Sequence, residues 1–326
     1  MGTVEVSHGP ITTKNTLDKV TSMLRYGICE MQGWRRTMED THLIKLNVGT
    51  NNNTHIFGIF DGHGGREVAN YVKNHFTDIF LNSEKYKKGN IKDAIKETYL
   101  QLDKNLETKE AMKELTIDHF EFNKQYKIEE NENENEFNIL KKEYIENIAY
   151  TIGCTANILI IYNNELYFAN CGDTRSILLK KGEVYKMSID HKPELPNEYS
   201  RIRKAGCNIN EGRINGLLNL SRSIGDFQFK LRKDLKQEEQ GVTCNPDILY
   251  GKKCDGDDFV VIGCDGVWEC ISNEGISDFI YDKFRNDRNV DLGKIIGEVF
   301  DRGIAKSGYE ENGCDNMTCM IIQFKK

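Results

Sequence analysis

Four aspartates in this sequence stand beside short apolar runs. They are Asp61 after residues 56–60, Asp173 after 166–170, Asp265 after 259–263, and Asp315 before 317–324. Runs of this length predict buried strands, so each strand would deliver a carboxylate to an edge of a sheet. Carboxylates gathered at such edges repel one another unless a cation neutralises them, and oxygen ligands of this kind suit Mg²⁺ or Mn²⁺. The pattern therefore predicts a metal site, in a form that holds two ions.

A second group of polar residues precedes the strand predicted over 41–46. It contains Arg35, Glu39 and Asp40. In an isolated segment, arginines followed by acidic residues are typical of a solvent-exposed turn. Beside the strand that ends in Asp61, the same residues instead indicate a phosphate-binding site. Arginine can donate two hydrogen bonds to a pair of phosphate oxygens, and the carboxylates can hold metal-bound waters.

Composition limits the class of protein. The chain has 326 residues, enough for a sizeable core, and a net charge of −7, which argues against nucleic acid as a partner. Its ten cysteines include no CxxC pair and follow no signal peptide, so we expect reduced thiols. No apolar run reaches the ~18 residues of a membrane span. We expect a soluble protein of the cytoplasm or nucleus and, with no oligomerisation signature, a monomer.

Two segments carry weak patterns. Residues 1–24 show no strong period and are expected to form a tether. Gly2 invites N-myristoylation and membrane attachment, but Val6 stands where the simple motif has Ser or Thr. Charged residues dominate from about 107 to 146, which predicts an acidic insertion with a mobile loop over 129–136. Its acidity could recruit a basic partner, although a solvated loop is the simpler interpretation.

The remaining patterns predict helices and hairpins. The expected helices cover 66–81, 91–106, 198–205, 274–284 and 291–306, and further strands cover 25–31, 157–162, 165–170, 176–180, 183–187 and 247–250. Asn215-Gly216 predicts a type I′ turn, because both residues tolerate positive φ. Consecutive hairpins indicate antiparallel pairing. We therefore expect an α+β fold, a central antiparallel β-sandwich flanked by helices on both sides, in one domain over 25–326.

Arg35 and eight short motifs in this order resemble the metal-dependent protein serine/threonine phosphatases of the PP2C type. The motifs are MED at 38–40, FDGHGG at 60–65, GCTA at 153–156, NCGDTR at 170–175, DHKP at 190–193, SRSIGD at 221–226, CDGVW at 264–268 and DNMT at 315–318. Any one of them alone would be weak, but together they span about 25–324. The resemblance implies a β-sandwich with a metal cleft at one end, and phosphoproteins as substrates.

The same resemblance implies a set of metal ligands. Two ions would be held by Asp61, the carbonyl of Gly62, Asp265 and Asp315, with Glu39 and Asp40 acting largely through bound water. Asp173 and Glu269 would form a weaker third position, where family members often have Asp in place of Glu269.

A mechanism follows from these roles. Two divalent ions about 3.5 to 4 Å apart can bridge one water and lower its pKa, so that no protein nucleophile is required. Arg35 would bind the non-bridging phosphate oxygens. His63 would protonate the leaving oxygen, with a role in orienting a ligand as the alternative. We expect Arg222 and Asp226 to form a buried pair that supports a flap over 190–218.

Two other functions are consistent with parts of the pattern. The fold could serve as a catalytically weak scaffold, but the aspartates Asp61, Asp265 and Asp315 are all present, together with Arg35 and His63. This completeness favours catalysis. A calcium-binding module would need closely spaced loop ligands, whereas these acids lie far apart in the sequence.

Overall fold

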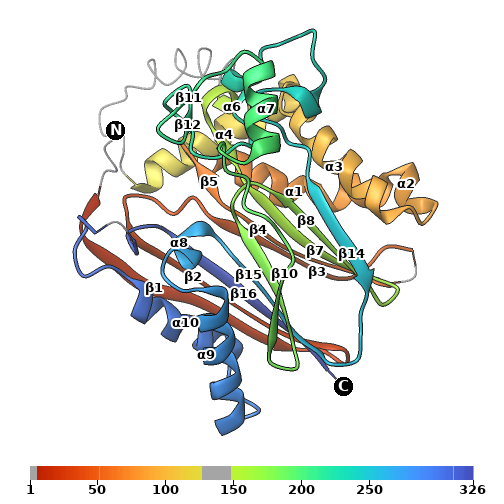
Figure 1. Ribbon diagram of the computed structural model, residues 1–326, viewed down its shortest axis with the longest axis vertical. Helices are drawn as coiled ribbons and strands as arrows, with labels where there is room; N and C mark the ends of the chain where they lie inside the picture. The colour runs from red at the N-terminus through yellow and green to blue at the C-terminus, as the bar shows by residue number, and fades with distance from the viewer. Residues whose placement is uncertain (1–5, 51, 127–147, 311, 326) are drawn as a thin grey trace.

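Two antiparallel sheets form the centre of the computed structural model, which describes residues 6–50, 52–126, 148–310 and 312–325. The first has the order β1 (Val6–Val20), β2 (Leu24–Arg35), β16 (Met317–Phe324), β15 (Asp257–Gly263), β9 (Arg175–Lys180) and β10 (Glu183–Lys186). The second has the order β14 (Asp247–Lys252), β8 (Glu165–Cys171), β7 (Ala156–Tyr162), β4 (Thr54–Phe60) and β3 (Thr41–Val48). Figure 1 shows the two sheets stacked between helices, which confirms the predicted α+β sandwich.

The central strands are apolar throughout because both of their faces are buried. In β4 all seven residues are buried. Phe57 and Ile59 point into the core between the sheets, whereas Ile56 and Phe60 point into a second core beneath the helices. This alternation follows from the two-residue period of a strand. It explains why the sequence shows short continuous apolar runs rather than alternating ones.

Helices cover the outer face of each sheet (Figure 1). The second sheet is covered by α1 (Glu67–Asn82), α2 (Glu84–Lys87), α3 (Ile91–Asn105), α4 (Lys109–Tyr126) and α6 (Ile148–Thr151), and the first by α9 (Asn273–Asn286) and α10 (Leu292–Gly303). The Tyr99 hydroxyl ties α3 to the second sheet, because it donates to the carbonyls of Ala156 at 3.2 Å and Ala169 at 3.3 Å. In the described ranges, no helix is both long and apolar enough to cross a membrane.

Shorter elements gather near one end of the sandwich. They are β5 (Gly62–His63), β6 (Gly153–Cys154) and β13 (Ile224–Gly225), which form a small sheet, α8 (Asp265–Trp268), and the flap elements α7 (Pro196–Lys204), β11 (Ile209–Asn210) and β12 (Arg213–Ile214). Asn215 and Gly216 have positive φ angles of 51° and 74°, as predicted.

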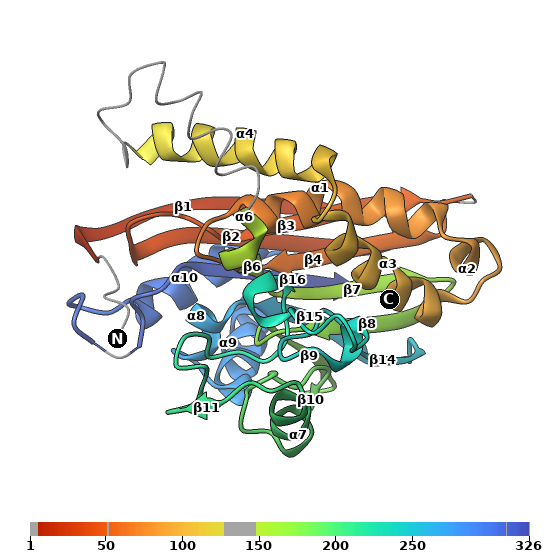
Figure 2. The ribbon, with the colours of Figure 1, turned by 90° about the horizontal axis from the view of Figure 1, so that it is seen from above.

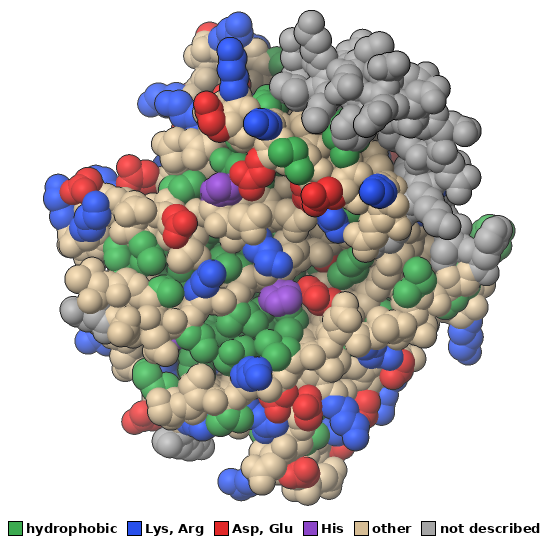
Figure 3. Space-filling model, turned by 180° about the vertical axis from the view of Figure 1, so that it is seen from behind, with side chains coloured by type: hydrophobic (Ala, Val, Ile, Leu, Met, Phe, Trp, Pro, Cys, Tyr) green, Lys and Arg blue, Asp and Glu red, His purple; other side chains and the backbone are tan. Residues whose placement is uncertain are grey.

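Figure 2 shows α7 at the edge of the molecule away from α4. On the face in Figure 3, acidic and basic side chains are interspersed.

Two expectations about the weakly patterned segments were wrong. The tether predicted over 1–24 is a strand from Val6 to Val20, which pairs with β2 along the edge of the first sheet. An edge strand carries many polar residues, and these obscured its period. The insertion predicted from about 107 begins with a regular helix, α4, whose side chains Leu115 and Phe122 are buried. The predictions about Gly2 and the loop 129–136 lie outside the described residues.

Candidate functional site

The predicted carboxylates converge at the end of the sandwich. Asp61 follows β4, Asp265 begins α8 just after β15, and Asp315 lies just before β16. Side-chain oxygens of Asp61, Asp173 and Asp265 all lie within 4.8 Å of one another. The segments that carry Asp265 and Asp315 can approach each other closely because residue 266 is glycine. A Cβ atom there would lie 2.1 Å from the Asn316 carbonyl oxygen and 3.0 Å from Cβ of Asp315.

The crowding of these carboxylates disfavours their charged forms. Burial, together with the neighbouring carboxylates, raises the pKa values of Asp61 and Asp265 well above their usual range. Burial also raises the pKa of Asp40 to about 7, with a contribution from Asp315. The Oδ2 atom of Asp40 is buried and has no hydrogen-bond partner among the described residues. A bound cation would relieve both the repulsion and the unpaired oxygen.

Among the described residues of this site, the carboxylate oxygens suit a metal ion better than the nearby thiol does. Cys264 lies close to Asp40 and Asp61. Its thiol, however, donates to the Asn316 carbonyl oxygen at 3.4 Å and accepts from the Thr318 amide at 3.2 Å. Burial raises the pKa of this thiol well above its usual value, so the thiolate that a metal requires is disfavoured. The remaining carboxylates fit a hard divalent ion such as Mg²⁺ or Mn²⁺.

Asn316 holds the segment that carries Glu39, a role that sequence reasoning missed. Its Oδ1 accepts from the Glu39 amide at 2.9 Å, and its Nδ2 donates to the carbonyls of Gln32 at 2.8 Å and Thr37 at 2.9 Å. The Glu39 carboxylate accepts from the Thr37 hydroxyl at 2.8 Å and the Gly65 amide at 3.2 Å. Glu39 is therefore fixed beside the metal-ligand candidates. The only signal in the sequence was the position of Asn316 next to Asp315.

Arg35 is anchored at the same site. Its Nη2 donates to Oδ2 of Asp315, and its side chain remains 41% exposed. Burial alone would lower the pKa of Arg35, but the charge of Asp315 outweighs this effect and raises it. The guanidinium is thus fixed on one side by a candidate metal ligand and open to solvent on the other. This arrangement leaves donors available for a phosphate.

His63 pairs with an aspartate that sequence reasoning assigned elsewhere. Its Nε2 lies 2.7 Å from Oδ2 of Asp226, whose side chain is 1% exposed. Gly153 makes room for this pair, because a Cβ atom there would lie 2.2 Å from Oδ2 of Asp226 and 2.7 Å from Nε2 of His63. Burial alone would lower the pKa of His63, but Asp226 outweighs it and raises the pKa. Asp226 therefore favours the protonated form of the imidazole.

The expected pair between Arg222 and Asp226 does not form. Arg222 instead donates to Oε1 of Glu198 in the flap at 2.6 Å and to Oδ1 of Asp247 at 2.8 Å. The two residues are four apart, but the chain between them is not helical and contains β13, so their side chains diverge. Arg222 does support the flap, as predicted, through a different partner.

The two residues expected at a third metal position differ in their burial. Asp173 is 2% exposed and belongs to the cluster with Asp61 and Asp265. Glu269 lies one helical turn after Asp265 and is exposed. Among the residues that the structure describes, Glu269 joins neither group of closely spaced metal-ligand atoms. The Nζ atom of Lys192 lies 2.5 Å from Oδ2 of Asp173.

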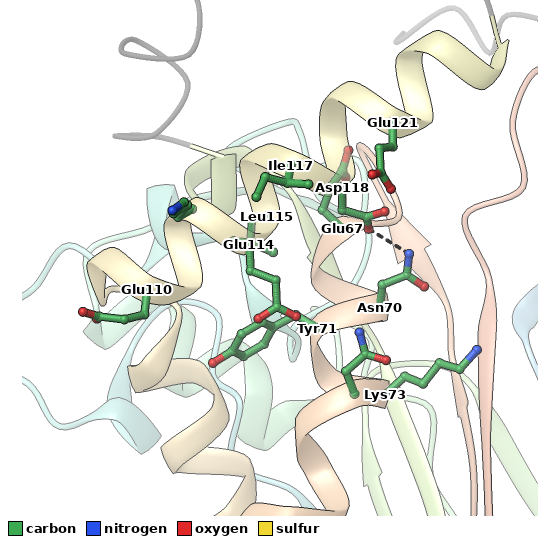
Figure 4. A pocket seen from close by; sticks show the side chains of 12 residues that line it. Glu67, Asn70, Tyr71, Lys73, Glu110, Glu114, Leu115, Ile117, Asp118 and Glu121 are labelled. Carbon is green, nitrogen blue, oxygen red and sulfur yellow. Dashed lines mark hydrogen bonds between the residues drawn. The ribbon is translucent and has the colours of Figure 1, made fainter.

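A cavity of about 540 Å³ lies apart from the carboxylate cluster, between α1 and α4 (Figure 4). Its lining includes Glu67, Glu114 and Asp118, and Asp118 accepts a hydrogen bond from Asn70 at 2.8 Å. None of the predicted metal ligands lines it. The candidate site is therefore defined by converging side chains and not by the depth of a pocket.

The β-sandwich and its cluster of carboxylates, with an arginine and a histidine beside it, define a metal-dependent hydrolase. Comparison with known proteins is consistent with this class. The family model described as "Protein phosphatase 2C" matches residues 24–119 and 121–312. The chain is 39% identical to "Probable protein phosphatase 2C 11" from Oryza sativa subsp. japonica, covering 97% of this chain and 90% of that protein. It is 37% identical to "Probable protein phosphatase 2C 6" from Paramecium tetraurelia, covering 97% and 98%.

Solved structures show the same fold. A serine-threonine phosphatase 2C from Toxoplasma gondii superposes with a TM-score of 0.69 at 16% identity, covering 95% of this chain and 99% of that one. A second phosphatase from Toxoplasma gondii gives a TM-score of 0.68 at 22% identity, covering 96% of each chain. The chain belongs to the protein phosphatase 2C family, and it is a metal-dependent protein serine/threonine phosphatase.

Proposed function

We propose that two divalent ions, Mg²⁺ or Mn²⁺, are held by Asp61, the carbonyl of Gly62, Asp265 and Asp315. The convergence of these acids from strand ends far apart in the chain carries the proposal, since Asp61 and Asp265 share one cluster and the charge of Asp315 acts on both. The raised pKa values of Asp61 and Asp265 and the unpartnered Oδ2 of Asp40 support it, because a cation would offset both. Glu39 and Asp40 act through ordered water. When bound, the ions supply Lewis acidity and lower the pKa of the attacking water.

The other residues of the site bind the substrate and move a proton. Arg35 holds the non-bridging oxygens of the phosphorylated serine or threonine, since its guanidinium is fixed by Asp315 and open to solvent. His63 protonates the leaving hydroxyl oxygen. Asp226 occupies Nε2 of the ring, so Nδ1 is the nitrogen that we assign to this transfer. Asp226 acts through His63 as a positioning residue.

Hydrolysis of a phosphothreonine peptide by metal-stripped protein tests the assignment. We expect turnover only after Mn²⁺ or Mg²⁺ is added, and its loss in Asp265→Asn. Asp78→Asn is the matched control, because Asp78 is an exposed aspartate on α1. Full activity of Asp265→Asn would contradict the ligand set. Folded wild-type protein without turnover under any metal condition would favour the scaffold alternative.

We also propose that the enzyme acts as a monomer in the cytoplasm or nucleus, with membrane attachment only where Gly2 is lipidated. Co-expression with an N-myristoyltransferase, followed by intact-mass measurement, tests the last point. A Gly2→Ala variant is the control. An unchanged mass of the wild-type protein would contradict lipidation at Gly2, and light scattering of the same sample tests the monomer.

A further inference from the structure

The segment 190–193 is clamped beside the carboxylate cluster. Arg175 donates to both carboxylate oxygens of Asp190, at 3.0 Å and 2.7 Å. His191 is 1% exposed, and its Nδ1 accepts from the Gly172 amide at 3.1 Å. The two residues that precede Lys192 are thus both held by hydrogen bonds. The backbone of Lys192 is held in a defined position relative to Asp173.

Lys192 reaches from this segment to the most buried acid of the cluster. Its Nζ lies 2.5 Å from Oδ2 of Asp173, whose side chain is 3% exposed, whereas the Lys192 side chain is 40% exposed. The contact is an ion pair between an ammonium group and a buried carboxylate. It neutralises Asp173 without any metal ion.

Simultaneous binding of a metal ion and the Lys192 ammonium group to the Asp173 carboxylate is unfavourable. Asp173 lies within 4.8 Å of ligand atoms of Asp61 and Asp265, so a cation held by Asp173 would lie next to the cluster. It would also lie next to Nζ of Lys192, and two cations at such a distance repel one another strongly in a partly buried site. Binding an ion at Asp173 therefore requires Lys192 to leave, and the exposed part of its side chain gives it room to do so.

We propose that Lys192 is a built-in cation that competes with a third divalent ion for Asp173. The inference rests on the two-ion site proposed above. In the wild-type protein two ions bind, and a third binds only weakly, after Lys192 has moved away. Lys192 is thus the residue that sets how many ions the phosphatase holds at a given metal concentration.

Mn²⁺ binding, followed by calorimetry and by the electron paramagnetic resonance of free Mn²⁺, tests this competition without an activity readout. Lys192→Met keeps most of the side-chain length and removes the charge. We expect it to bind a third ion about tenfold more tightly than the wild type. Adding Asp173→Asn to this variant should abolish the gain, and Lys192→Arg should behave like the wild type. Lys233→Met, at an exposed lysine, is the matched control.

Equal third-ion affinity in the wild type and Lys192→Met would overturn the inference, while binding of the first two ions would still support the proposed metal site. Absence of all Mn²⁺ binding would instead overturn the metal site itself. A second measurement uses the wild type alone. Amine acetylation of Lys192, read by mass spectrometry, should rise at Mn²⁺ concentrations above those that fill the first two sites. Acetylation independent of Mn²⁺ would overturn the competition.

Discussion

Nε2 of His63 lies 2.7 Å from Oδ2 of Asp226, and this contact joins two segments that are 163 residues apart. Asp226 has a left-handed backbone conformation, with φ of 54° and ψ of 41°. Its Oδ2 also accepts a hydrogen bond from the Ser223 hydroxyl. A buried aspartate in a left-handed conformation thus holds the imidazole of His63 and the hydroxyl of Ser223 at one oxygen. Its charge favours the protonated imidazole of His63, which is the form that a general acid needs.

Asp226→Asn should shift the pH dependence of catalysis. The pKa of His63 is raised by Asp226, so removing the charge lowers it. A general acid must be protonated, and kcat falls as the pH rises through its pKa. The alkaline limb of the kcat profile should therefore move to lower pH. A displacement of one pH unit would lower kcat about tenfold on that limb, with little change in KM.

The choice of substrate separates this role from a structural one. The phenolate of p-nitrophenyl phosphate leaves without a proton, so Asp226→Asn should hydrolyse it at nearly the wild-type rate. If Asp226→Asn lowered kcat equally for p-nitrophenyl phosphate and for a phosphothreonine peptide, Asp226 would only maintain the fold. An alkaline limb at the wild-type pH would show that His63 is not the acid.

Arg35→Lys should weaken recognition of the phosphate itself. Lysine keeps the charge but loses the planar pair of donors that matches two phosphate oxygens. We expect kcat/KM to fall by roughly 10- to 100-fold, because a hydrogen bond to a charged group contributes about 1.5–3 kcal/mol. The loss should appear on peptide and p-nitrophenyl phosphate alike. Arg36→Lys, at the exposed neighbouring position, is the control and should retain activity.

Without bound metal, the free energy of unfolding should depend on the ionisation of the buried carboxylates. Asp40 has a folded-state pKa of about 7, above its unfolded value near 4. Its contribution to stability is therefore present at low pH and is lost as the pH rises through about 7. The free energy of unfolding of metal-free protein should fall by about 1 kcal/mol between pH 6 and pH 8 from this group.

Urea denaturation at several pH values measures this slope. Asp40→Asn cannot ionise, so its metal-free form should show a smaller decline. Excess Mn²⁺ should reverse the trend, because the ion stabilises the carboxylate anions and binds more tightly as they lose protons. Metal-free protein that gains stability between pH 6 and pH 8 would contradict the buried, repelling cluster.

Glu198→Gln should loosen the flap. Burial alone would raise the pKa of Glu198, but the hydrogen bond from Arg222 and the charge of Arg201 outweigh it and lower the pKa to about 2. The ionised form therefore contributes about 3 kcal/mol of stability. This contribution is present above pH 4.5 and is lost as the pH falls towards 2.

Limited proteolysis within the flap, at pH 7 and at lower pH, gives the readout. Glu198→Gln should be cut faster than the wild type at pH 7, and the difference should shrink in acid. Glu107→Gln, at an exposed position after α3, is the control. Equal protection of both variants at pH 7 would show that the Arg222 pair does not hold the flap.

The parts of the site that could be predicted from the sequence are those set by strand ends. Asp61, Asp265 and Asp315 were predictable because each adjoins a strand buried on both faces, whose apolar run is unmistakable. β1 was not, because an edge strand tolerates polar residues. The partner of His63 was not predictable either, since a contact across 163 residues leaves no local pattern.

The position of β16 governs when the protein can become a phosphatase during its synthesis. β16 comes after every other described strand in the chain, yet it lies between β2 and β15 near the middle of its sheet. Asp315 lies two residues before it, so we expect this carboxylate to reach Asp61 and Asp265 only when the last strand has been inserted. A nascent chain that has already folded its second sheet still lacks the Asp315 carboxylate at the candidate site. We therefore expect dephosphorylation to begin only after β16 has been synthesised and the first sheet has closed.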